Sequence, residues 1–334
     1  MFLDKVDLLV LKEIESNSRA YLKDIAEKAG VSIQTISKRL ERLERKLKLR
    51  YTVELKLDAL GMQSEHLIRV KFPSGMAPDA DVVKRAVSSP FVQLACRMKG
   101  DFDLFLWAVA PNARIFSSVI EPWIREELNE YIEDWIAHPI VSHRAGFLPI
   151  SEDLIREFKI RESRKEVLRI LNSNSRIPIM KLAEQLGVTE PTAEYHLKKA
   201  QPFIKRFTAF FEGKGEFTHV VRFFQVKGKK KDIEADGRGI TQAYLDSDPR
   251  LFNRMVYASM PSGGMDCCFI ETYSSLEDCC AATEQLLSEK RIIGRHVSAV
   301  VSKVLKGAIP IRKVDLASEC KCLLSPVDAS EELR

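Results

Sequence analysis

At 334 residues, the chain is long enough for two or more domains that each bury a core of their own. Hydrophobic residues make up 45% of it and charged residues 30%, a globular balance that argues against long disordered tracts. The formal net charge is only +5, so the place where charge gathers matters more than the total. No apolar run approaches the roughly 18 residues of a membrane span. Acidic residues among the first apolar ones argue against a signal peptide. We expect a cytoplasmic protein without a membrane partner.

An internal repeat is the strongest pattern in the sequence. Residues 11–40 align without a gap with residues 168–197, so that the letters SNSR at 16–19 fall on the same letters at 173–176. This period is far above the roughly 20–50 residues of solenoid repeats. It therefore predicts a duplicated set of domains, not a stacked array.

The first copy begins with three predicted helices. Asp4 can cap a helix that runs to about Glu15, and a second helix covers 22–29. Gly30 permits a turn after that helix, and Ser32 can cap the third helix. The apolar face expected on the third helix comprises Ile33, Ile36, Leu40, Leu43 and Leu47. A short helix, a glycine turn and a capped helix form the helix-turn-helix layout, whose last helix enters the major groove of DNA.

The outward side of this third helix is polar and basic. Gln34, Ser37 and Lys38 lie near its N-terminus, where recognition helices contact base edges. Between residues 32 and 50, seven basic residues face two acidic ones, a difference of +5 that equals the excess of the whole chain. Such a local concentration suits phosphate binding, although a solvated helix face is the alternative. The basic side continues through Arg39, Arg42, Arg45 and Arg50.

The region after the first helix-turn-helix alternates strands and helices. Strands are predicted at 66–73, 91–98, 102–109 and 132–147, and helices at 78–88 and 115–131, where Pro122 could start a separate helix. Lys99-Gly100-Asp101 reads as a tight turn. The order βαββαβ fits an antiparallel sheet covered on one face by two helices.

The second helix-turn-helix keeps the frame but changes the outward residues. Pro191 takes the place of Gln34, Glu194 that of Ser37 and Tyr195 that of Lys38. Four basic residues face two acidic ones between 189 and 206, a difference of +2. We predict that this copy binds DNA weakly, reads another sequence or serves as packing. Charge reversal of Arg39 and Arg42 should then abolish binding, whereas changing Lys198 and Lys199 should cost little.

The second sheet region follows a charge-rich link at 151–163. Strands are predicted at 219–226 and 293–304 and a helix at 276–289, and KGKKKD at 227–232 reads as an added loop. We expect His66 and Arg69 to align with His219 and Arg222. The tetrapeptide GGMD at 263–266 corresponds to GDFD at 100–103.

Seven cysteines are an odd number, and six of them follow residue 266. Adjacent pairs such as Cys267-Cys268 do not have the spacing of zinc fingers or ribbons. We expect buried, reduced thiols, with a metal site or a disulfide as the alternative. Cys320 and Cys322 lie in a polar tail and are the pair expected to be exposed and oxidisable. No metal and no cofactor is predicted.

The segments AEKAGVSIQTISKRLERLE, LKLDALG and GDFDLFL together resemble the Lrp/AsnC family. The resemblance implies an α+β chain, a tandem repeat of a winged helix-turn-helix followed by a ferredoxin-like βαββαβ sandwich. It implies a transcriptional regulator, not an enzyme, with double-stranded DNA as its partner. The first copy departs from the family at 46–49, KLKL, where a glycine step is usual before the wing. The residues implied to face DNA are Ser32, Gln34, Thr35, Ser37, Lys38 and Arg39.

The resemblance also implies that the sheet domains pair and that effectors, often amino acids, bind at the pairing interface. Gly100, Asp101 and Asp103 would border that site, as would Gly263 and Asp266, although a simple hairpin turn is the alternative. The two sheet domains could pair within one chain, and a homodimer or larger oligomer would restore two good DNA-binding heads. The predicted domains are 1–61, 62–150, 151–217 (with the link) and 218–312, followed by a tail at 313–334.

Two other classes of function fit the same architecture. Siroheme decarboxylases share it, and they would need His and Arg side chains around a tetrapyrrole. The candidates are His66, His143, His219 and Arg144. A nucleoid-binding or transcription-machinery-binding protein would instead bind DNA without sequence preference and with steep salt dependence.

Overall fold

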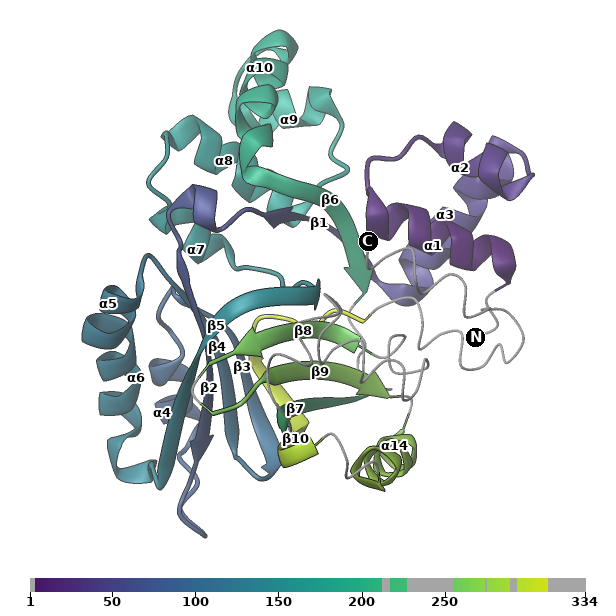
Figure 1. Cartoon of the computed structure of the whole chain (residues 1–334). Coiled ribbons are helices and arrows are strands. Elements are labelled where there is room, and N and C mark those ends of the chain that lie inside the picture. The colour runs from purple at the N-terminus through teal and green to yellow at the C-terminus, as the bar shows by residue number, and fades with distance from the viewer. Residues whose placement is uncertain are drawn as a thin grey trace. The chain divides into compact units, whose positions relative to one another are not determined.

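The computed structural model describes residues 4–211, 217–226, 255–262, 264–273, 275–288 and 293–311. These residues form two compact units, and each unit draws on both halves of the chain (Figure 1). The paired helix-turn-helix unit joins the residues before Gln63 to the stretch from Pro149 to Phe211. The barrel unit joins Gln63–Leu148 to the described residues from 217 onwards. None of the helices described is long and apolar enough to cross a bilayer.

The first helix-turn-helix has the predicted layout. Asp4 and Asp7 cap the first helix reciprocally, because each backbone N–H donates to the other residue's carboxylate (3.2 and 2.9 Å). Gly30 ends the second helix with a φ of 64°, and Ser32 caps the third by accepting from the Thr35 N–H at 3.2 Å. One prediction was wrong: Ile33 is 46% exposed, because it precedes the first full turn that packs on the core. The elements are α1 (Lys5–Ser16), α2 (Leu22–Ala29), α3 (Ile33–Leu47), β1 (Leu49–Leu55) and η1 (Asp58–Leu60).

The second helix-turn-helix repeats this layout. Gly187 ends α9 with a φ of 65°, and Pro191 lies in the first turn of α10, where its missing N–H costs nothing. The link at 151–163 is partly helical, since Ser151 caps a short helix within it. The elements are α7 (Glu152–Glu157), α8 (Glu162–Ser173), α9 (Ile179–Leu186), α10 (Glu190–Ala200), η4 (Gln201–Phe203) and β6 (Ile204–Phe211).

The strands that follow the two helix-turn-helix copies pair with each other. β1 pairs antiparallel with β6, with Thr52 opposite Thr208. The Thr52 hydroxyl donates to the carbonyl of Asn172 at the end of α8 (2.9 Å), and the Thr208 hydroxyl donates to that of Glu15 at the end of α1 (2.6 Å). Ala209 on β6 belongs to the buried core of the first copy. The strand of each copy therefore contacts the first helix of the other copy, while Leu49 and Tyr51 of β1 also pack on the core of the first copy.

The repeated letters SNSR lie where the copies meet. The Ser18 and Ser175 hydroxyls contact each other at 2.6 Å. Arg19 donates to the carbonyls of Ser175 (2.6 Å) and Ile177 (2.8 Å), and Arg176 donates to that of Ser18 at 2.7 Å. These reciprocal bonds define a pseudo-twofold axis. The longest identical stretch of the repeat thus holds the copies together instead of facing a ligand.

The sheet domains pair within the chain, as predicted, and form a closed eight-stranded barrel. Its strand order is β10-β3-β4-β2-β5-β8-β9-β7, so the pairs β10–β3 and β5–β8 join the two copies. The strands of the first copy are β2 (Ser64–Lys71), β3 (Val92–Gly100), β4 (Leu104–Ala110) and β5 (Asp134–Gly146). Those of the second are β7 (Thr218–Val226), β8 (Met255–Pro261), β9 (Cys267–Tyr273) and β10 (Ile293–Lys306).

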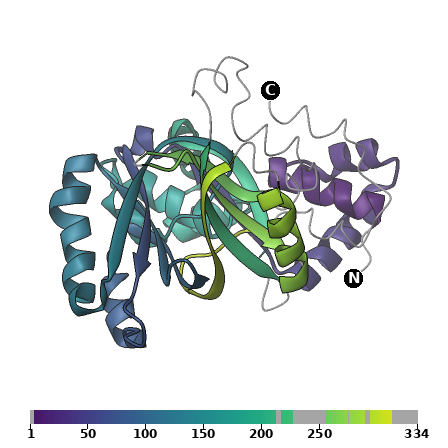
Figure 2. The same ribbon diagram turned by 60° about the horizontal axis from the view of Figure 1, so that its bottom comes forward.

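Helices cover the outer face of the barrel (Figure 2). In the first copy, α4 (Ala80–Ala86) and α6 (Glu121–Leu128) enclose an apolar core that includes Ile68 and Val70. The segment predicted as helical at 115–131, with Pro122 as the start of a separate helix, contains a π-turn that ends at Ile120, and α6 begins one residue before Pro122. Its parts are α5 (Ala113–Ile115), η2 (Phe116–Ile120), α6 and η3 (Asn129–Tyr131); the second copy carries α14 (Leu276–Ser288).

The predicted alignment of Arg69 with Arg222 was wrong by one residue. The Asp103 N–H donates to the Val70 carbonyl (2.9 Å), and the Asp266 N–H donates to that of Phe224 (2.7 Å), so Val70 corresponds to Phe224. Phe223 therefore occupies the position of Arg69. A shift of one residue moves a strand side chain to the opposite face. For the same reason, His66 and His219 do not correspond.

The shift places the two arginines in different surroundings. Arg69 lies inside the barrel, with its guanidinium 4.9 Å from the ring centroid of Phe223 and bonded to His138. Arg222 lies on the helix-bearing face and forms a buried ion pair with Glu271 at 2.6 Å. Several predicted features fall outside the described residues: the loop at 227–232, Gly263, Cys320, Cys322 and the tail.

Candidate nucleic-acid interface

Helix α3 presents one apolar and one polar face. Ile36, Leu40 and Leu43 are buried against α1 and α2. On the other side, Gln34 and Lys38 are exposed near the helix N-terminus. The other exposed residues among those predicted to bind DNA are Ser32, Arg45 and Arg50, while Thr35, Ser37, Arg39 and Arg42 are half-buried.

Several of the predicted contacts already have partners within the unit. Ser32 and Thr35 are engaged with each other, with their hydroxyls 2.9 Å apart. The Ser37 hydroxyl reaches Glu41 at 3.4 Å, one turn later. The Arg50 guanidinium stacks over the ring of Phe210 at 5.6 Å. Among the predicted residues of this helix, Gln34 and Lys38 are best placed for base edges, and Arg45 for phosphates.

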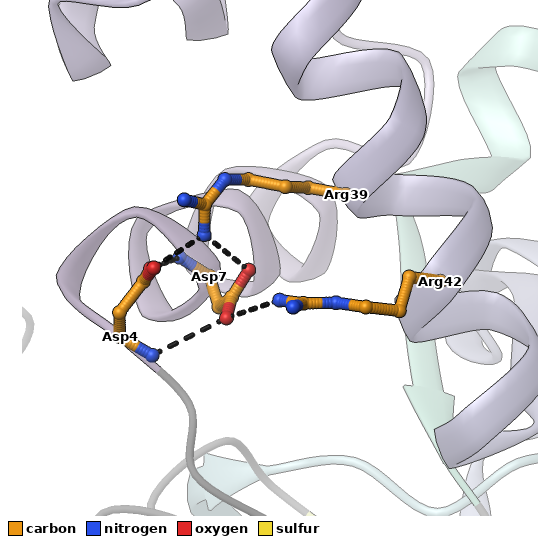
Figure 3. Close-up of polar contacts among 4 residues, drawn as sticks. All are labelled: Asp4, Asp7, Arg39 and Arg42. Atoms are coloured by element: carbon orange, nitrogen blue, oxygen red, sulfur yellow. Dashed lines mark hydrogen bonds and ion pairs between the residues drawn. The ribbon is translucent and has the colours of Figure 1, made fainter.

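Arg39 and Arg42 do not point away from the protein. Both bind Asp7 of α1, whose side chain is only 2% exposed (Figure 3). Arg39 donates to Asp7 Oδ1 at 2.9 Å and also to Asp4, and Arg42 donates to Asp7 Oδ2. We call Asp4, Asp7, Arg39 and Arg42 the aspartate clasp. It fixes α3 on α1.

The clasp has a measurable electrostatic signature. Partial burial raises the pKa of Asp4, but the hydrogen bonds from Arg39 and from the Asp7 N–H outweigh it, and the net pKa lies below the usual value. Sequence reasoning missed the clasp, and DNA contact by Arg39 and Arg42 stays a prediction. The signal that could have found it is Asp7, an acidic residue inside the apolar face formed by Val6, Val10 and Ile14.

The equivalent face of α10 has a different chemistry. Tyr195 is 57% exposed, and Lys199 lies over its ring at 5.5 Å. Glu190, Pro191 and Glu194 are exposed along the same side. A carboxylate repels phosphate, and proline has no backbone N–H to donate. These features are consistent with the prediction that this face binds DNA weakly.

The residues predicted to border an effector site lie in structural contacts. Asp101 and β10 bond twice, from the Asp101 N–H to the Ser298 carbonyl (3.0 Å) and from the Ser298 N–H to the Asp101 carboxylate (2.8 Å). A Cβ at Gly100 would lie 2.7 Å from the Ser298 carbonyl oxygen. Asp103 accepts from the Phe72 N–H at 2.9 Å. The Gly-Asp turn thus joins the two sheet copies, and effector binding there stays a prediction.

The structure does not bring together His66, His143 and His219, the histidines named from the sequence for a tetrapyrrole site, although Arg69 and His138 meet inside the barrel. His66 stacks on Phe116 under the helices, with ring centroids 3.5 Å apart. His219 contacts Thr272 at 2.8 Å. Burial lowers the pKa of both histidines to about 4. His143 lies apart from them at the β5–β8 seam, where it contacts Glu65 (2.8 Å) and Tyr257 (3.0 Å); the side chain of Arg144 is outside the described part.

Most of the described cysteines are buried thiols. Four of the described cysteines are buried, and burial raises the thiol pKa of Cys96, Cys267, Cys268 and Cys279. Cys280 is exposed, which differs from the expectation of a buried thiol at this position. No group of three or more potential metal ligands occurs within the described residues.

Comparisons with known proteins agree with this architecture. Residues 3–46 and 160–201 both match a family described as winged helix-turn-helix DNA-binding. An uncharacterized HTH-type transcriptional regulator of Pyrococcus horikoshii is 25% identical over 126 residues, which cover 37% of this chain and 84% of that protein. A regulator of the same description from Pyrococcus abyssi is 27% identical over 130 residues, again 37% and 84%.

A solved structure matches the whole chain. The crystal structure of the siroheme decarboxylase NirDL superposes with a TM-score of 0.60 at 14% identity, covering 98% of this chain and 100% of that one. At this identity the likeness establishes the fold alone. The chain is thus a tandem-duplicated protein with two winged helix-turn-helix copies and two paired sheet domains. The predicted architecture, a winged helix-turn-helix followed by a sheet domain and doubled in one chain, is confirmed.

Proposed function

We propose that the protein is a sequence-specific, DNA-binding transcriptional regulator of the Lrp/AsnC type that acts in the cytoplasm. The observation that carries the proposal is the outward face of α3, where Gln34, Lys38 and Arg45 are exposed on a helix held rigidly by Ser32 and the aspartate clasp. A rigid helix with amide and basic side chains near its N-terminus suits the major groove. The match of this region to a DNA-binding family, and the names of its archaeal relatives, support the same function.

Selection from random duplex DNA tests the proposal most directly. The full chain should enrich a defined sequence, and half-sites, if present, should lie about 10 base pairs or a multiple apart. The Lys38→Glu/Arg45→Glu variant should lose this enrichment, while a Lys84→Glu/Arg114→Glu variant with the same charge change in the barrel unit should retain it. Equal binding to random and selected DNA would instead support a nucleoid-type protein.

The dominance of the first helix-turn-helix in DNA binding is part of the proposal. It is supported by the exposed Gln34, Lys38 and Arg45 on the first copy and by the exposed Glu194 and Tyr195 at the corresponding face of the second. Charge reversal of Arg39 and Arg42, the test that the sequence suggests, would also break the aspartate clasp. Lys38 and Arg45 are better targets because neither forms an ion pair within the described residues.

We further propose that the chain has no enzymatic activity, despite a fold shared with a siroheme decarboxylase. The separation of His66, His143 and His219 supports this. Mixing the purified chain with haem tests it, since a shifted Soret band with stoichiometric uptake would favour the tetrapyrrole alternative. An unchanged spectrum would favour the regulator.

A small-molecule effector and a homo-oligomer complete the proposal. The effector would be an amino acid or similar molecule near Asp101, and a thermal-shift screen of amino acids against the chain and an Asp101→Ala variant tests it. Because the described strands of the barrel are all paired, oligomers would form through other surfaces of the sheet domains. Light scattering with and without DNA would identify them, and a strict monomer on DNA would contradict this part.

A further inference from the structure

The positions of the aspartate clasp carry basic residues in the second copy. With the repeat offset of 157, Asp4 corresponds to Arg161 and Asp7 to Arg164, while Arg39 corresponds to His196 and Arg42 to Lys199. The offset is the one that pairs Ser18 with Ser175 across the pseudo-twofold axis. Two carboxylates and two guanidiniums in the first copy are thus replaced by three permanent cations and a histidine.

The fold brings these four residues to one place. Helix α8 packs against α10 as α1 packs against α3. Because the clasp residues of the first copy touch one another, their counterparts lie on one flank of the second helix-turn-helix. We call Arg161, Arg164, His196 and Lys199 the basic flank.

The basic flank has no internal counter-charge. Within the described part of the chain, none of its four residues forms an ion pair; Arg164 stacks over the ring of Phe203 at 5.9 Å, and Lys199 over that of Tyr195. The nearest carboxylates on α8 serve other cations, Glu162 pairing with Lys165 (3.3 Å) and Glu166 with Arg169. Arg161 and Lys199 are exposed. A cluster of unpaired like charges is relieved when it binds a polyanion.

We propose that the basic flank binds the phosphate backbone of duplex DNA without reading its sequence; the inference rests on the proposed function. A helix lying in the major groove has a phosphate strand beside each flank. The outward face of α10 carries Pro191 and two glutamates, Glu190 and Glu194, whose carboxylates repel phosphates, whereas its flank suits phosphates. The second copy thereby adds affinity and the first adds sequence preference.

Fluorescence anisotropy on labelled duplexes tests the basic flank. For Arg161→Glu/Arg164→Glu, affinity for both selected and random duplexes should fall by about tenfold, and the slope of log K against log salt should shrink by roughly two. The preference for the selected sequence should not change. Arg161→Lys/Arg164→Lys should bind like the unaltered chain, because phosphate attraction needs charge more than geometry.

Two controls keep this test decisive. Lys84→Glu/Arg114→Glu makes the same charge change on exposed residues of the barrel unit, and an equal loss there would overturn the proposal. If Arg164→Glu disturbs the packing on Phe203, Arg161→Glu/Lys199→Glu replaces it. As a member of the flank, Lys199 is expected to matter for affinity, which differs from the sequence-based prediction that changing it costs little. Unchanged DNA affinity of the flank variants would overturn the proposal and point to an acidic protein partner. Failure of the unaltered chain to bind any duplex would instead refute the proposed function itself.

Discussion

The two helix-turn-helix copies have the same backbone arrangement, but their charged residues have different partners. In the first copy, Asp7 is buried and draws Arg39 and Arg42 onto α1, so the outward face of α3 is left to Gln34 and Lys38. In the second copy, no clasp exists among the described residues, and the outward face of α10 is acidic and aromatic. Net charge near a recognition helix is therefore a poor guide to DNA contacts until the internal ion pairs are known.

The largest expected difference between the copies is in DNA affinity. Lys38→Glu/Arg45→Glu removes two cations from the groove-facing side of α3 and adds two anions. We expect affinity for the selected duplex to fall by roughly 100-fold or more at physiological salt. Lys198→Glu, one turn after Glu194 on α10, should cost less than about threefold. Titration by gel shift measures both, and equal losses would contradict the asymmetry.

The next difference concerns stability. Asp7→Ala leaves Arg39 and Arg42 without their shared acceptor, and we expect a loss of about 2 kcal/mol in the free energy of unfolding. The loss stays this small because the arginine side chains are 26% and 41% exposed, so that solvent screens their charges. Arg164→Ala, at the equivalent position of the second copy, should cost less than about 1 kcal/mol.

Urea unfolding followed by circular dichroism measures both variants. DNA affinity of the Asp7→Ala variant should not fall by more than its lost stability explains, because the freed guanidiniums remain available to phosphate. A 100-fold loss of affinity in a folded Asp7→Ala protein would contradict this expectation. It would show that DNA binding requires the clasp to hold α3 in place.

The sequence predicted the architecture well because its main signals are local. Gly30, Gly187 and the caps at Asp4 and Ser32 define the helix ends by short-range chemistry. The turn at Gly100 likewise separates β3 from β4. These features need no knowledge of distant contacts.

The sequence was insufficient where contacts between residues far apart in the chain determine the structure. The roles of Arg39 and Arg42 depend on Asp7, more than 30 residues earlier in the chain. The alignment of Arg222 was wrong by one residue because it was based on the identical letters at His219 and Arg222. The alternation of side chains along the strand, which determines the face that a residue occupies, indicates the other register. The pairing of β1 with β6 could not be predicted for the same reason, since the offset of the repeat does not show which copy a strand contacts.

The two units should also differ in their response to acid. Burial lowers the pKa of His66, His219 and His296 to about 4, and that of His138 also lies below its usual value. A histidine kept neutral in the fold stabilises it fully above the unfolded pKa of about 6.5. This stabilisation is lost as the pH falls from 6.5 towards 4. All four residues belong to the barrel unit, so the barrel should weaken in that range.

The paired helix-turn-helix unit should lose stability at lower pH. Its Asp4 has a lowered pKa, so its contribution is present above the carboxylate's ordinary pKa and disappears below it. Tryptophan fluorescence reports the barrel alone, because Trp107, Trp123 and Trp135 all lie there. A fluorescence transition between pH 6.5 and 4 should precede the loss of helical circular dichroism. His66→Phe should shift this transition to lower pH, and simultaneous transitions in the unaltered chain would refute the difference.

The smallest expected effect lies where the two copies are alike. Ser18→Ala or Ser175→Ala removes one side of a buried hydroxyl pair and should cost about 1 kcal/mol in unfolding free energy. Since each hydroxyl is the other's partner, Ser18→Ala/Ser175→Ala should cost little more than either single change. The double-mutant cycle by urea unfolding measures the coupling. Additive losses would mean that the serines act through separate partners, Ser175 through its 3.4 Å contact with the Thr208 carbonyl, and that the pseudo-twofold axis depends mainly on Arg19 and Arg176.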